Sequence, residues 1–175
     1  MTVAQIAGIT ERDEVTTLLE LSQAAEDHRR KTGEDAGIIA KSMNNDDISA
    51  FMQWPYMNIC SDGRHGGHPR GYGSFPRVLG VFVRELGALT MPDAIFKMTA
   101  RAADNLGISD RGRIEAGLYA DLVLFNPDTI IDHATMREPN AMSTGIDRVW
   151  VNGTLAFDDG APTAAFAGQA VSRPE

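Results

Sequence analysis

A glycine-rich loop, residues 61–74, does most to limit how this chain can fold. It follows an apolar run, residues 56–60, that the sequence predicts to be a buried strand, and it precedes a helix that the sequence predicts to open at Pro76. Apolar strands that alternate with helices are typical of α/β units with parallel strands. In such sheets and barrels the reactive residues gather at the carboxyl ends of the strands. We therefore expect a candidate site where this loop begins.

The part of the chain before Gly107 alternates helix-like and strand-like segments. Capping residues and apolar spacing predict several helices there, and residues 38–40 form a further strand candidate. The helices are expected from Thr10 with a second cap at Asp13 to a stop at Gly33, from the caps at residues 44–47 to Pro55, from Thr90 with Asp93 over residues 94–98, and from Arg101 to a stop at Gly107.

The part of the chain after Gly107 has short β-type runs and tight turns. Residues 120–125 read as a strand, and residues 148–151 and 154–157 read as a hairpin around Asn152-Gly153. Asn-Gly suits a type I′ turn because both central residues need a positive φ. We therefore expect a β appendage after the α/β part.

Composition excludes several functional classes. The chain has 175 residues with 16 Lys and Arg against 24 Asp and Glu, a formal net charge of −8. This acidity argues against non-specific binding to nucleic acid or anionic membranes. The single cysteine, Cys60, allows no internal disulfide and fits a reducing compartment. No membrane-spanning run or signal peptide is evident, so the expected location is cytoplasmic.

Asp62 is the first residue in the loop that could carry chemistry. A carboxylate at the end of a strand can act as a general base, as a metal ligand or as both. An aspartate before a glycine is equally common as a turn former. The spacing alone leaves these two interpretations equal.

His65, His68 and Arg70 follow Asp62 and indicate an anion or substrate site, because arginine can hold a carboxylate through two hydrogen bonds. The alternative is that they are the polar residues any long loop turns toward water. Cys60 is expected to be a small buried strand residue. The sequence has no P-loop, no Gly-x-Ser-x-Gly and no zinc signature of the His-x-His or His-Glu-x-x-His type.

Several blocks together resemble the N-acyl-D-amino-acid deacylases (D-aminoacylases) of the metal-dependent amidohydrolase superfamily. The resemblance covers most of the chain. The blocks are Ser61-Asp-Gly63, His68-Pro-Arg70, Gly73-Ser-Phe-Pro-Arg-Val-Leu-Gly80, Lys97-Met-Thr99, Asn105-Leu-Gly107, Asp110-Arg-Gly-Arg-Ile114 with Gly117, Ala120-Asp-Leu-Val-Leu-Phe125 and Val151-Asn-Gly153.

This resemblance implies an α/β fold, the C-terminal part of a (β/α)8 TIM-type barrel over residues 1–109 and part of a small β-sandwich over residues 110–175. It also implies hydrolysis of N-acyl-D-amino acids to a carboxylate and a D-amino acid. A metal-bound water would be activated by Asp62, which would then protonate the leaving amine and could itself touch the metal. Arg70 would bind the carboxylate of the substrate, with Ser61, Gly63 and His68 around it.

One departure from the family pattern is large. These enzymes bind zinc through a His-x-His or through a cysteine and further histidines, and none of those segments occurs here. A whole barrel also needs about 250 residues. The chain alone is therefore expected to be inactive.

Two alternatives to the deacylase remain. One is a non-catalytic protein or a split-enzyme subunit that associates with itself or with a complementing N-terminal chain. The other is a cyclic-amide hydrolase of the same superfamily, which a carboxylate-binding Arg70 argues against. The expected small-molecule partner is an N-acyl amino acid, with no nucleic acid and no membrane.

Overall fold

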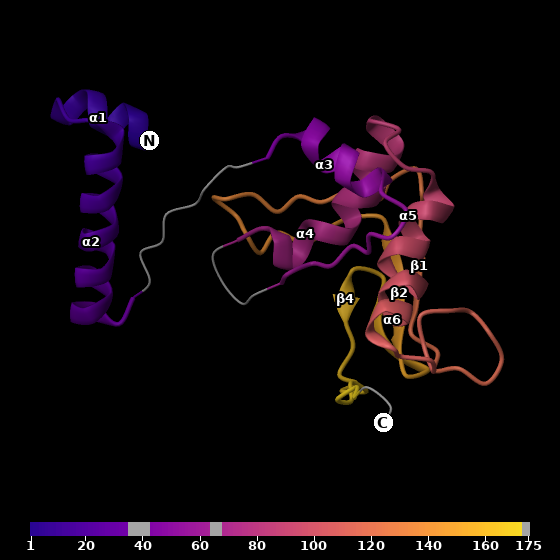
Figure 1. The fold of residues 1–175 in the computed structure, drawn as a ribbon. Helices are drawn as coiled ribbons and strands as arrows, with labels where there is room; N and C mark the ends of the chain where they lie inside the picture. Colours follow the sequence, from indigo (N-terminus) through magenta and orange to yellow (C-terminus); the bar gives the residue numbers. More distant parts are fainter. Residues whose placement is uncertain (35–42, 64–67, 173–175) are drawn as a thin grey trace. The chain divides into compact units, whose positions relative to one another are not determined.

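The computed structural model describes residues 1–34, 43–63 and 68–172 (Figure 1). The chain divides into two compact units, Met1–Asn44 and Asn45–Glu175. The expected domain boundary at 109/110 falls inside the second unit and stays a prediction. Among the described helices, none combines the length and the apolar character needed to cross a membrane.

The first unit holds two helices, α1 (Val3–Thr10) and α2 (Glu14–Thr32). The predicted cap at Asp13 is confirmed, since its carboxylate accepts a hydrogen bond from the Thr16 amide at 2.9 Å. The predicted stop at Gly33 is also confirmed, with φ at 75°. Thr10 does not begin this helix but ends α1, which the sequence pattern missed. The predicted strand at residues 38–40 lies outside the described residues.

The second unit contains five helical segments among its described residues. The predicted helices after residue 44 and after Thr90 are confirmed, and so is the stop at Gly107. The segments are α3 (Asn45–Gln53), α4 (Arg70–Arg77), the π-helix η1 (Val78–Glu85), α5 (Met91–Met98) and α6 (Ala100–Leu106).

The helix predicted to open at Pro76 begins at Arg70 instead, so Pro76 lies inside α4. Proline has no N–H, and the Tyr72 carbonyl four residues earlier therefore loses its usual α-helical donor. The Ser143 hydroxyl donates to that carbonyl at 3.0 Å. A partner distant in sequence thus offsets the cost of the proline, and no local pattern could have predicted it.

Seven buried side chains form the core of the second unit, and they come from α3, η1, α5 and two loops. They are Met52, Ile59, Val78, Leu79, Phe82, Ala94 and Ile130. Gly80 lets η1 approach residues 130–131 closely, because a Cβ there would lie 2.7 Å from the Ile130 carbonyl oxygen. The core therefore fixes η1 against residues 130–131.

The strand predicted at residues 56–60 is wrong: the structure assigns no strand there. A strand needs a neighbouring strand to receive its backbone hydrogen bonds. Here the Ile59 amide donates to the carbonyl of Lys97 on α5 at 3.0 Å. Ile59 is buried as expected, but Cys60 is exposed, which corrects its expected burial.

The described sheet has four antiparallel strands in the order β1-β2-β3-β4. The predicted strand and hairpin are confirmed, and Asn152 and Gly153 have φ values of 49° and 79° between the hairpin strands. The described part of the chain pairs no strands in parallel. The strands are β1 (Leu122–Phe125), β2 (Ile146–Val151), β3 (Thr154–Asp158) and β4 (Ala161–Pro162).

Candidate functional site

The structure brings Asp62 and Arg70 together. The Arg70 Nη1 atom lies 3.0 Å from Asp62 Oδ2. Asp62 belongs to the loop after residues 56–60, and Arg70 is the first residue of α4. The carboxylate is 73% exposed and the arginine side chain 39% exposed, so water or a ligand can reach the pair. We refer to these two residues as the Asp62–Arg70 site.

The backbone at Asp62 turns sharply. Its φ is 44°, in the left-handed region that aspartate tolerates better than most residues with a Cβ. The next amide, on Gly63, donates to the Ser61 hydroxyl at 3.1 Å. This local turn presents the Asp62 carboxylate at the surface.

Residues on both sides of Arg70 hold it in place. The Arg70 amide donates to His68 Nδ1 at 3.2 Å. The Ser74 hydroxyl lies 2.8 Å from the Arg70 carbonyl oxygen and 3.3 Å from the Ser61 carbonyl oxygen. Ser74 thereby connects α4 to the segment that carries Asp62. Ser74 was not singled out from the sequence, because its bond to Ser61 joins residues 13 positions apart.

Arg70 keeps hydrogen-bonding capacity beyond Asp62. Its Nε atom is buried and has no partner among the described residues. A guanidinium offers five N–H donors in a planar fork that matches a carboxylate. Because the side chain is 39% exposed while Nε is buried, a second anionic group would bind through the exposed part of the guanidinium.

Asp132 also lies close to α4. Its side chain is 10% exposed and stands 3.6 Å from Arg77 Nη1. A Cβ on Gly73 would come within 3.0 Å of the Asp132 Cβ, so glycine allows this approach. Asp132 was not singled out from the sequence, because only the fold brings it to α4.

The described residues do not fit a metal centre. Across residues 1–34, 43–63 and 68–172, no group of three or more His, Cys, Asp or Glu side chains could hold an ion. Asp62 could offer one oxygen, but its carboxylate already faces Arg70. His65, the other sequence candidate in this loop, lies outside the described residues.

Comparison with known proteins shows the family of this chain. Residues 52–157 match the model of an amidohydrolase family. A D-aminoacylase of Alcaligenes xylosoxydans xylosoxydans is 38% identical over 141 residues, which are 79% of this chain and 29% of that protein. The chain thus spans less than a third of this relative.

Solved structures agree with this match. A D-aminoacylase known for its binuclear metal centre superposes with a TM-score of 0.78 and 34% identity, over 95% of this chain and 33% of its own. An N-acyl-D-glutamate deacylase of Bordetella bronchiseptica, complexed with zinc and a phosphonate inhibitor, superposes with a TM-score of 0.70 and 36% identity. The superposition covers 95% of this chain and 34% of that one. The chain therefore has an α/β amidohydrolase fold and belongs to the amidohydrolase family, among the D-aminoacylases.

Proposed function

We propose that the protein to which this chain contributes hydrolyses N-acyl-D-amino acids to a carboxylate and a D-amino acid. The relatives carry this activity in their names, as D-aminoacylase and N-acyl-D-glutamate deacylase. The observation that carries the proposal is the Asp62–Arg70 site, because it joins a reachable carboxylate to a cation with unused donors.

Asp62 is the proton carrier in this proposal. Its carboxylate takes a proton from the attacking water and delivers it to the amide nitrogen as the C–N bond breaks. The nitrogen then leaves as a neutral amine rather than as an amide anion. The exposure of Asp62 supports this role, since both water and substrate can reach its oxygens.

Arg70 binds the free carboxylate of the substrate in this proposal. That carboxylate competes with Asp62 for the guanidinium, and its arrival frees Asp62 to accept a proton. His68 and Ser61 keep the supporting positions that their hydrogen bonds give them. A Cβ on Gly63 would lie 3.1 Å from the Ser61 hydroxyl oxygen and 3.4 Å from the Gly71 Cα, so glycine allows the loop to lie close to α4.

The metal belongs to the proposal for the whole protein. When bound, zinc would supply an activated water at neutral pH. Asp62 could offer one ligand oxygen, and the other ligands would have to come from outside the described residues, which hold no group of three or more suitable side chains. The barrel and sandwich architecture, with domains at 1–109 and 110–175, is part of the same proposal. It is supported by the superposition of this chain on about a third of the length of each solved relative.

The same lack of a metal-ligand cluster favours a second candidate, a subunit that needs a complementing chain to act. To test whether activity requires residues from another chain, zinc and an N-acetyl-D-amino acid are added to this chain and turnover is measured. We expect no turnover from the chain alone. Tight stoichiometric zinc binding with turnover would contradict this expectation.

A chimera tests the primary proposal. In it, this chain replaces the matched segment of the Alcaligenes D-aminoacylase, and release of the free D-amino acid is measured with zinc present. We expect turnover from the chimera. A folded, zinc-loaded chimera without turnover would contradict the proposal.

A further inference from the structure

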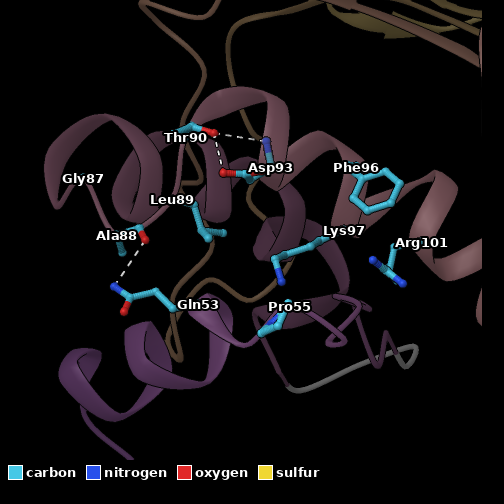
Figure 2. Close-up of a pocket in the computed structure, with 10 residues that line it drawn as sticks. All are labelled: Gln53, Pro55, Gly87, Ala88, Leu89, Thr90, Asp93, Phe96, Lys97 and Arg101. Atoms are coloured by element: carbon cyan, nitrogen blue, oxygen red, sulfur yellow. Dashed lines mark hydrogen bonds between the residues drawn. The ribbon is translucent and has the colours of Figure 1, made fainter.

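The second unit contains a cavity of about 480 Å³ that the proposed reaction does not use. Figure 2 shows that it lies between the end of α3, the loop before α5, and the side chains of α5 and α6. None of its lining residues belongs to the Asp62–Arg70 site. Two of them are cations, Lys97 and Arg101, and we refer to it as the Lys97–Arg101 cavity.

Lys97 is buried without a counter-charge. It is only 6% exposed, and its Nζ atom donates to the Trp54 carbonyl oxygen at 2.5 Å. That carbonyl is neutral, and Lys97 makes no ion pair with the described residues. An ammonium taken out of water without an opposite charge is costly. The site therefore favours an added negative charge.

Asp93 does not supply that charge. It lies four residues before Lys97 on α5, a spacing that suits an ion pair on a helix. Its carboxylate instead accepts a hydrogen bond from the Thr90 hydroxyl at 2.7 Å, at the start of the helix. Figure 2 shows Asp93 turned toward Thr90, while Lys97 points toward Pro55.

Arg101 adds an independent indication. Its Nε atom is buried and has no acceptor among the described residues. The guanidinium carbon stands 4.9 Å from the centre of the Phe96 ring, which holds the group against an apolar face. A planar guanidinium held in this way offers paired donors to an oxyanion.

We propose that the Lys97–Arg101 cavity binds a small oxyanion, a phosphate or a carboxylate. Such a ligand supplies both missing elements: a negative charge for the Lys97 ammonium and an acceptor for Arg101. Pro55, Leu89 and Phe96 form the apolar part of the lining around these two cations. This site is separate from the proposed reaction and needs neither substrate nor metal.

Calorimetric titration of the full chain tests the proposal. Sodium phosphate and sodium acetate are titrated separately, at an ionic strength kept constant with sodium chloride. We expect saturable binding of at least one anion, and the one that binds identifies the ligand as a phosphate or a carboxylate. If neither anion binds, the proposal is overturned.

Two arginine variants separate this cavity from general charge effects. Arg101→Gln removes the donor in the cavity and should weaken binding by about tenfold or more. Arg113→Gln is the control for the loss of an arginine charge, since Arg113 lies outside the cavity and pairs with Asp104 at 2.7 Å. It should bind like the unaltered chain. Equal weakening in both variants, or none in Arg101→Gln, would show only an adventitious ion.

Discussion

The two ends of one segment, residues 54–62, meet cations in opposite ways. At the exposed end, Arg70 faces the charged carboxylate of Asp62 at 3.0 Å. At the other end, the buried Lys97 side chain meets only the neutral carbonyl of Trp54, whose own side chain is exposed. The first pair is balanced in charge and reachable from solvent, whereas the second carries an unbalanced positive charge inside the protein.

This difference separates two kinds of chemistry. An exposed ion pair contributes little to stability, and its partners can be exchanged for a ligand at small cost. A buried cation without a counter-ion keeps a standing preference for an anion. We therefore expect substitutions at the Asp62–Arg70 site to change catalysis and substitution of the buried Lys97 to change anion binding.

Asp62→Asn should have the largest effect, because asparagine cannot carry the proton to the leaving nitrogen. In the chimera, kcat should fall by about a hundredfold or more. Steady-state kinetics with an N-acetyl-D-amino acid as substrate measure this fall in kcat. Asp158→Asn is the matched control, since Asp158 is also exposed and pairs with an arginine, Arg148, at 2.9 Å. Equal kcat values for the two variants would remove Asp62 from the mechanism.

Arg70→Ala should raise KM for the same substrate by about tenfold to a hundredfold, because a charged hydrogen bond to the substrate carboxylate is lost. The value of kcat should change less. Arg77→Ala, on the same helix but paired with Asp132, should leave KM unchanged. A larger rise in KM for Arg77→Ala than for Arg70→Ala would place the contact with the substrate carboxylate elsewhere on α4.

Ser74→Ala should have a moderate effect at the exposed end. Losing the hydroxyl between the Arg70 and Ser61 carbonyls should lower the free energy of unfolding by about 1 kcal/mol. In the chimera, KM should rise as α4 shifts, and Ser74→Thr should restore it. Ser49→Ala removes a hydroxyl that bonds only within α3, so it should leave KM unchanged.

Lys97→Met should have the smallest effect on stability. Because the ammonium has no counter-charge to lose, replacing it with an apolar side chain of similar length should change the free energy of unfolding by about 1 kcal/mol or less. Anion binding should disappear with it. Chemical denaturation without phosphate checks the first expectation. A loss of several kcal/mol would mean that the Trp54 contact alone satisfies Lys97.

Local signals predicted the parts of the fold that local contacts determine. The caps at Asp13 and Thr90 and the Asn152-Gly153 turn depend on neighbours within a few residues, and all three are confirmed. Residues 56–60 had the composition of a strand, but strand formation depends on a partner elsewhere in the chain. The start of α4 likewise depends on the distant Ser143.

The candidate site shows the same limit. The sequence drew attention to Asp62 and Arg70 through their shared loop and the family resemblance, and the structure brings them into contact. Their roles stay proposals. Ser74 contacts Ser61, 13 residues earlier, and Asp132 contacts Arg77 across η1, α5, α6 and β1, so residue spacing does not reveal either contact. Lys97 entered the sequence analysis only as part of a motif.

The most direct measurement pairs a change in the protein with a change in the substrate. The chimera and its Arg70→Ala variant are each assayed for kcat/KM with an N-acetyl-D-amino acid and with the corresponding carboxamide, which lacks the negative charge. If Arg70 binds the substrate carboxylate, Arg70→Ala should reduce kcat/KM for the acid about tenfold or more and leave the amide nearly unaffected. Equal losses for both substrates would contradict the proposed Asp62–Arg70 site.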